Sequence, residues 1–198
     1  IITEGTAPSK NGLGYPNIPG IFSKEQISGW KTVTDEVHDQ GGKIFLQIMH
    51  TGRIGHPLNI PEGGEIVAPS AIAASGEIFT IQKGMQAHPV PKELSIEDIE
   101  ETQDEFVKAA INAIEAGFDG IEIHAANGYL PNQFINPKSN LRDDQYGGSI
   151  ENRCRFVLEL IEKTIGAIGS GRTSIRFSPF VEYNDMGLYD EIPATYKY

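Results

Sequence analysis

Cysteine, positive charge and long apolar runs are scarce in this chain of 198 residues. The single cysteine, Cys154, excludes an internal disulfide and any zinc site or iron–sulfur cluster built on several cysteine ligands. Lys and Arg number 16 against 27 Asp and Glu, and the net charge of -11 argues against nucleic acid and anionic membranes as partners. No apolar run is long enough to span a bilayer. We therefore expect a globular cytoplasmic protein that binds neither nucleic acid nor membrane.

Common nucleotide and metal motifs are missing as well. The glycines form neither the G-x-G-x-x-G pattern of dinucleotide-binding folds nor the G-x-x-x-x-G-K-[ST] pattern of P-loops. His50 and His56 lie in a glycine-rich stretch without a carboxylate at ligand spacing, so we expect no metal site. Cys154 falls on a helix face, where packing explains it better than nucleophilic catalysis.

Strand-like and helix-like segments alternate along the chain. A capping box, Ser23-x-x-Gln26, predicts the start of the first helix, and Gly41-Gly42 predicts its end. Buried strands that alternate with helices predict an α/β fold with a parallel sheet. The segments are strands at 1–4, 43–49, 119–124 and 172–177, and helices at about 23–40, 95–116 and 149–168.

The strand count predicts part of a larger barrel. A (β/α)₈ TIM barrel typically needs ~250 residues and eight strands. The predicted strands supply half that number, so we expect residues 1–198 to form a single partial barrel domain or a small open sheet. The chain begins with a strand-like run and stops in a loop-like one, and we expect both ends to cut through a larger domain. On the last helix, Val157, Leu160 and Ile165 are predicted to face inward.

Residues 51–94 show no sustained period, and five prolines interrupt them. Such a long irregular segment inside a compact domain is often a functional lid. We expect a lid-like excursion at about 51–94, with a short hairpin near Ile78–Ile81.

Three polar side chains cluster just after the third predicted strand. His124, Asn127 and Tyr129 lie at the carboxyl end of that strand, and the carboxyl ends of parallel strands are where α/β enzymes bind ligands. His124 and Asn127 could both donate to one oxygen, and Tyr129 could deliver a proton. A tyrosine in a glycine-containing turn is often only packing, so the functional interpretation depends on neighbours at the same rim.

Two further polar residues interrupt otherwise apolar strands. Gln47 and Arg176 both need partners if they are buried. Gln47 could cap a neighbouring strand, and Arg176 could pair with Glu4 or Glu122. Alternatively, both could contact the polar edge of a bound ring, with Arg176 neutralising an anionic edge. Because several such residues meet at one rim, we favour the functional interpretation.

Several long sequence motifs occur in a fixed order along the chain, and together they resemble one protein family. They are Ile2–Thr6, Gly14–Gly20, Leu46–Arg53, Gly117–Phe134, Ser139-Asn140 with Asp144–Arg153, and Ile175–Pro179. Across them the chain resembles the Old Yellow Enzyme family. The resemblance implies an FMN-binding (β/α)₈ barrel of the NADPH dehydrogenase type, in which NAD(P)H reduces the flavin. The reduced flavin would then transfer hydride to the activated C=C bond of an enone, enal or nitroalkene.

The resemblance also implies roles for individual residues. His124 and Asn127 match the pair that hydrogen-bonds the substrate oxygen, and Tyr129 matches the residue that protonates the α-carbon. Tyr15 matches an aromatic residue of the substrate pocket. Met49 stands in that pocket where many members carry a tryptophan. These roles agree with the chemistry, since prepositioned donors stabilise enolate-like charge and a phenol can act as the acid.

For the cofactor, Gln47 and Arg176 match residues at the pyrimidine edge of the flavin, and Gly5 matches a backbone contact to it. Pro131 departs from the family's usual leucine and is expected to alter the turn behind the acid. The chain resembles only the second to fifth strands of the family's barrel.

That partial coverage leaves an alternative function. In it, the chain is an incomplete half-barrel without autonomous FMN binding or activity. Open edges of a parallel sheet invite pairing. We therefore expect either a homo-oligomer or a second chain that completes the barrel. A barrel of the phosphate-sugar isomerase kind does not explain His124-x-x-Asn127-x-Tyr129.

Overall fold

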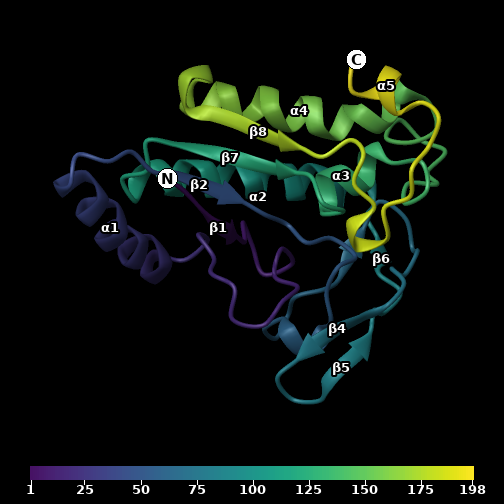
Figure 1. Ribbon diagram of the computed structural model, residues 1–198, viewed down its shortest axis with the longest axis horizontal. Coiled ribbons are helices and arrows are strands. Elements are labelled where there is room, and N and C mark those ends of the chain that lie inside the picture. The colour runs from purple at the N-terminus through teal and green to yellow at the C-terminus, as the bar shows by residue number, and fades with distance from the viewer.

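The computed structural model describes residues 1–198, and its centre is a four-stranded parallel sheet. The strands follow one another across the sheet in the order β1-β2-β7-β8 (Figure 1). Their bounds are β1 Ile2–Thr6, β2 Phe45–Ile48, β7 Gly120–Ala125 and β8 Thr173–Phe177. Each predicted strand is present and each neighbouring pair is parallel, as the alternation predicted. The sheet does not close, so β1 and β8 form its two edges.

Helices connect the strands, and serines begin the three long ones. Ser23, Ser95 and Ser149 each accept a hydrogen bond from the backbone N–H three residues later. The predicted capping box of Ser23 and Gln26 is confirmed. The helices are α1 Lys24–Asp39, α2 Ile96–Glu115, α3 Leu130–Ile135, α4 Ile150–Ile168 and α5 Ile192–Thr195. The 3₁₀ turns are η1 Pro57–Asn59, η2 Ser170–Arg172 and η3 Tyr183–Asp185. None of the helices has the length and apolar character that crossing a lipid bilayer requires.

The two faces of the sheet differ in chemistry because side chains alternate along each strand. One face carries Leu46, Ile121 and Ile123, which join Phe106 of α2 and Leu160 of α4 in the main hydrophobic core. The opposite face, here called the polar face, carries the residues that alternate with these. They are Gln47, Glu122, His124 and Arg176.

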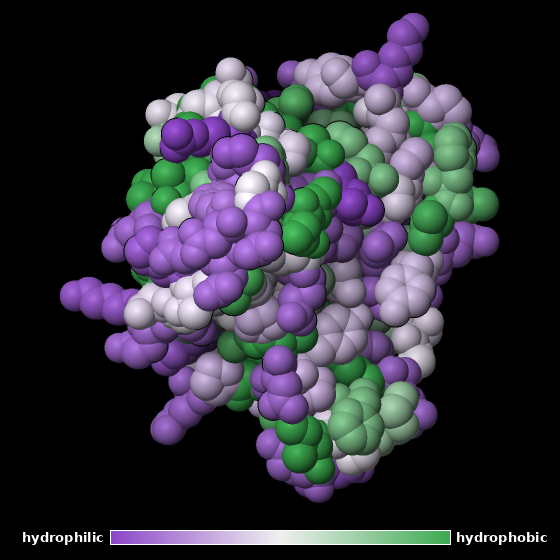
Figure 2. Space-filling model, turned by 60° about the vertical axis from the view of Figure 1, so that its left-hand side comes forward, coloured by the Kyte–Doolittle hydropathy of each residue, from purple (hydrophilic) through white to green (hydrophobic).

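The excursion after β2 contains two small sheets. The first pairs β3 Val67–Ala68 with β6 Lys92–Glu93, and the second is a hairpin of β4 Glu77–Thr80 and β5 Gly84–Ala87. The hairpin confirms the one expected near Ile78–Ile81. It lies at the bottom of Figure 1 and exposes Phe79, Ile81 and Met85, and apolar surface gathers at the same end of the molecule in Figure 2.

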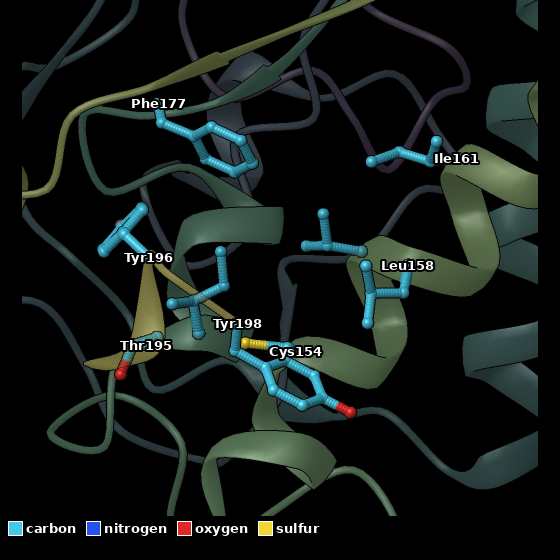
Figure 3. Close-up of a pocket in the computed structure, with 9 residues that line it drawn as sticks. Cys154, Leu158, Ile161, Phe177, Thr195, Tyr196 and Tyr198 are labelled. Atoms are coloured by element: carbon cyan, nitrogen blue, oxygen red, sulfur yellow. The ribbon is translucent and has the colours of Figure 1, made fainter. Parts of the chain in front are cut away.

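Beside β8 the molecule has an apolar cavity of about 230 Å³, bounded by α4 and the C-terminal residues (Figure 3). Cys154, Leu158 and Phe177 are among its lining residues. Cys154 is buried, as a packing role predicts, and burial raises the pKa of its thiol. Ile165, predicted to face inward, is instead 38% exposed, because no element of this chain covers that part of α4.

Arg142 fastens the excursion to the loop before α4. Its Nη1 donates to the carbonyl oxygens of Pro69 at 2.9 Å and Leu94 at 2.6 Å. Its Nε and Nη2 bind the carboxylate of Asp144 at 3.1 and 2.5 Å. The Arg142 side chain is only 5% exposed, so these partners replace water around a buried charge.

Replacing Arg142 with methionine should lower the free energy of unfolding by about 3 kcal/mol, since it strips the partner from buried carbonyls and from Asp144. Urea unfolding followed by circular dichroism measures the change. Arg155→Met is the matched control, because the Arg155 side chain is 34% exposed and its ion pair with Glu151 spans 3.7 Å. Equal losses in both variants would contradict the anchoring role of Arg142.

Candidate active site

His124 lies next to the last residue of strand β7 and is held as a neutral hydrogen-bond donor. Its Nδ1 accepts from the backbone N–H of Ala126 at 3.3 Å. The proton of the neutral ring therefore sits on Nε2, which is left to donate. Burial, together with the positive charge of Arg176, lowers the pKa of His124 to about 4. At neutral pH the site thus holds an imidazole N–H rather than an imidazolium.

Asn127 is fixed through its backbone. It adopts a left-handed conformation with φ of 56°. Its N–H donates to Ser178 Oγ at 2.8 Å, and its carbonyl oxygen accepts from Asn184 Nδ2 at 2.9 Å. The side-chain amide is not used in these contacts, so it can serve a ligand.

Tyr129 stands between His124 and Tyr15. Its ring meets that of His124 edge-on at a centroid distance of 4.8 Å. Its hydroxyl donates to the Tyr15 hydroxyl at 3.4 Å. Burial raises the pKa of the Tyr129 phenol, so the group is protonated at neutral pH and can act as an acid. Tyr129 also caps α3, and Pro131 lies in the first turn of that helix, where proline is tolerated.

A small apolar cluster surrounds the Tyr129 ring. Met49, Ile54 and Ala74 are its other buried members, and Tyr15 packs against it. Gly5 allows Met49 to take this position, since a Cβ at Gly5 would lie 2.5 Å from Met49 Sδ. The two residues predicted for the substrate pocket, Tyr15 and Met49, are therefore both brought to Tyr129.

Glu122 joins the two residues predicted for the cofactor. Its carboxylate is nearly buried and accepts from Gln47 Nε2 at 2.6 Å and from Arg176 Nε at 2.9 Å. The alternative partner of Arg176, Glu4, is not the one bound. The Arg176 side chain is 48% exposed on the polar face, although it binds Glu122. An amide and a guanidinium on this open face suit the oxygen- and nitrogen-bearing edge of a heteroaromatic ring.

The register of the sheet ties these groups together. Gly5 pairs with Gln47, Gln47 with Glu122, and His124 with Arg176. The structure thus brings seven of the eight predicted site residues into two linked groups. The members are Tyr129 with His124, Tyr15, Met49 and Gly5, and Gln47 with Arg176. Asn127 is adjacent in the chain, but its side chain contacts neither group through a hydrogen bond.

Sequence reasoning missed a turn that lies over the site. Residues Tyr183–Asp185 form η3, and a Cβ at Gly128 would lie 2.8 Å from Asn184 Cβ. Buried Arg53 donates to the carbonyl oxygen of Asp185 at 3.0 Å. The Asn-Asp pair is a turn signal, yet nothing local indicates what the turn covers. No group of three or more His, Cys, Asp or Glu side chains gathers as a metal site.

Comparison with known proteins bears on this geometry. The profile of the NADH:flavin oxidoreductase / NADH oxidase family matches residues 1–197. A probable flavin mononucleotide-dependent alkene reductase of Leishmania infantum is 47% identical over 98% of this chain and 54% of its own length. The 12-oxophytodienoate reductase 7 of Oryza sativa subsp. japonica is 43% identical over 98% of this chain and 49% of its own length.

Solved structures agree with the sequence comparison. The Old Yellow Enzyme homologue from Zymomonas mobilis superposes with a TM-score of 0.94 at 41% identity, over 99% of this chain and 54% of that one. Morphinone reductase superposes with a TM-score of 0.93 at 42% identity, over 98% of this chain and 53% of that one. The chain spans about half the length of the relatives it matches. The predicted family resemblance and the partial barrel are both confirmed.

The lowered pKa of His124 should make stability depend on pH. An unfolded histidine binds its proton near pH 6.5, whereas folded His124 binds one only near pH 4. The unfolded state therefore holds more protons between these values, so stability contributed by His124 is complete above pH 6.5 and is lost as pH falls to 4. His124→Gln should flatten this slope by up to about 1.4 kcal/mol per pH unit, measured by urea unfolding.

His56→Asn is the control for this measurement, because Asn can replace the His56 Nδ1 that accepts from Leu58 N–H at 3.1 Å. It lies outside the site and should leave the slope as in the parent chain. An unchanged slope in His124→Gln would show that His124 is not held neutral by burial.

Proposed function

We propose, since the chain belongs to the NADH:flavin oxidoreductase / NADH oxidase family, that it forms the catalytic half of an FMN-dependent alkene reductase. One observation carries the proposal: the neutral imidazole of His124, whose Nδ1 is occupied by the Ala126 N–H, meets the ring of the buried Tyr129 at a centroid distance of 4.8 Å beside the polar face. A donor for an oxygen and an acid for a carbon are what reduction of an activated alkene requires. The substrates are enones, enals or nitroalkenes.

The donors of the polar face fit the ring edge of FMN. Gln47 and Arg176 would hold the pyrimidine edge, and Gly5 would contact it through its backbone. Arg176 offers a fixed positive charge, which favours negative charge developing at that edge. When bound, FMN supplies the hydride, and NAD(P)H renews it. Glu122 keeps both donors in place, since its carboxylate binds each of them within 3 Å.

His124 and Asn127 would bind the oxygen that activates the alkene. Negative charge grows on this oxygen as hydride adds to the β-carbon, and a prepositioned donor is worth about 3 kcal/mol there. The Nε2 proton of His124 is fixed by the Nδ1 contact to Ala126, so it donates without a prior change of tautomer. Tyr129 would then give its proton to the α-carbon.

The excursion at 51–94 would act as a lid that keeps water from this step. Support comes from Ile54 and Ala74, both excursion residues that pack against Tyr129. An apolar wall beside the phenol strengthens every electrostatic contact inside the site.

A second candidate function is favoured by the open edge at β8. The chain spans about half of its relatives, and Phe177 at this edge is 44% exposed beside the apolar cavity (Figure 3). In this alternative the chain is an incomplete half-barrel, which binds FMN only after a second chain or a second copy completes the sheet.

A chimera tests the proposed function. In it, this chain replaces the matching 54% of the Leishmania infantum relative. The chimera should retain a flavin absorption band through gel filtration, lose it on addition of NADPH or NADH, and regain it on addition of an enone. The isolated chain should lose FMN on the same column, and light scattering of that sample reports whether it self-associates. A folded but colourless chimera would overturn the proposal.

Tyr129→Phe in the chimera separates the two half-reactions. Alkene reduction should slow by at least about 100-fold, because the proton donor is gone. Flavin reduction by NADPH should stay nearly unchanged, since that step needs no phenol. Stopped-flow absorbance follows both. Tyr146→Phe is the control, because the Tyr146 hydroxyl donates to Glu159 at 2.8 Å, away from the site. Equal loss of both half-reactions would contradict the role of Tyr129.

A further inference from the structure

The phenols of Tyr15 and Tyr129 form a pair that the proposed function does not yet use. Tyr15 lies in the loop between β1 and α1, and Tyr129 follows β7. Their hydroxyl oxygens lie 3.4 Å apart, and their rings are perpendicular at a centroid distance of 6.4 Å. Each hydroxyl can both donate and accept, so the direction of this contact can reverse when one phenol ionises.

The surroundings of Tyr129 make its ionisation costly. Tyr129 is 9% exposed and packs with Met49, Ile54 and Ala74. An acid in this position becomes a phenolate once its proton leaves, and a buried anion needs a hydrogen-bond donor. The Nε2 proton of His124 already binds the substrate oxygen in the proposed function, so it does not serve the phenolate. The Tyr15 hydroxyl is the neighbouring group that can turn toward the phenolate.

The two phenols are not equivalent. Burial raises the pKa of both phenols. The contact between them raises the pKa of Tyr15 further, whereas it offsets part of the rise at Tyr129. Negative charge therefore favours Tyr129, with Tyr15 remaining protonated as the donor. Tyr129 is the phenol that contacts the His124 ring.

Asn184 supplies a second donor. One N–H of its amide is bound to the Asn127 carbonyl oxygen at 2.9 Å, which leaves the other free. The amide lowers the pKa of both phenols, whereas the neighbouring Tyr183 phenol raises both. Asn184 and Asp185 are both left-handed, with φ of 57° and 60°. Such strain persists where contacts enforce it, and here Asp185 is held by Arg53 and by the N–H of Ser75 at 3.1 Å.

We propose that Tyr15 is a positioning residue that donates a hydrogen bond to the Tyr129 oxygen as its proton leaves, with the Asn184 amide assisting. The inference rests on the proposed function of Tyr129. In the step, the O–H bond of Tyr129 breaks, and a C–H bond forms from the electron pair on the substrate α-carbon. Tyr15 keeps its own proton throughout. The Tyr129 phenolate afterwards takes a proton from water.

The test measures the ionisation of residue 129 directly. Tyr129 is replaced in the full chain by a difluorotyrosine, whose phenol ionises at a lower pH than that of tyrosine, and is titrated by ¹⁹F NMR. Tyr15→Phe should raise the pKa of this phenol by about one unit, the value of one hydrogen bond to a charged group. Asn184→Gly keeps the left-handed backbone but removes the amide, and it should raise the pKa by a smaller amount.

Tyr146→Phe is the control, since it removes a buried phenol that is bonded elsewhere. It should leave the titration unchanged. A Tyr15→Phe titration that coincides with the parent, or that shifts to lower pH, would overturn the proposal.

Alkene reduction rates of the chimera show whether the role of Tyr15 or the proposed role of Tyr129 as the acid is wrong. Tyr15→Phe should slow alkene reduction less than Tyr129→Phe does and should move its pH profile to higher pH. If Tyr129→Phe leaves alkene reduction intact, the proposed acid is wrong whatever Tyr15 does. If Tyr129→Phe abolishes it while Tyr15→Phe leaves both the titration and the profile unchanged, Tyr129 is the acid and Tyr15 does not support it.

Discussion

A nearly buried carboxylate, Glu122, governs the arrangement of the polar face. A charge with so little access to water must be matched by donors, and here Gln47 and Arg176 from the two neighbouring strands supply them. The requirement fixes three strands in one register. It also holds an amide and a guanidinium together on this face, and the Arg176 side chain remains 48% exposed there. Without Glu122, Gln47 and Arg176 would share no hydrogen-bond acceptor that holds them close together.

The proposed chemistry depends on the central position of β7. This strand is buried along its whole length and pairs on both sides, so the loop that follows it begins from a rigid point. The end of β7 and this loop carry His124, Asn127 and Tyr129 within six residues. Preorganisation is therefore built into one short segment. The flavin-edge donors, by contrast, come from separate strands and are held together by Glu122.

The sequence predicted correctly those features that depend on interactions between residues close together in the chain. The capping serines, the helix ends at glycine and the alternation of buried strands all act over a few residues, and parallel pairing then implied which polar groups share a rim. Contacts between distant segments were not predictable in the same way. The Tyr15–Tyr129 contact spans 114 positions, and the turn at Asn184 reaches back to Asn127. Ile165 was misassigned because amphipathic spacing identifies an apolar face but does not say what covers it.

The strand order has a consequence for how the chain is made on the ribosome. In the sequence β1-β2-β7-β8, each strand pairs with the one synthesised just before it in the same sheet. Each new strand can therefore dock as soon as it has emerged, without displacing a finished pair. Since domains fold largely in the direction of synthesis, the sheet can form strand by strand from β1 to β8 during translation. The β8 edge, with the apolar cavity beside it, would then be the last part of the sheet to form.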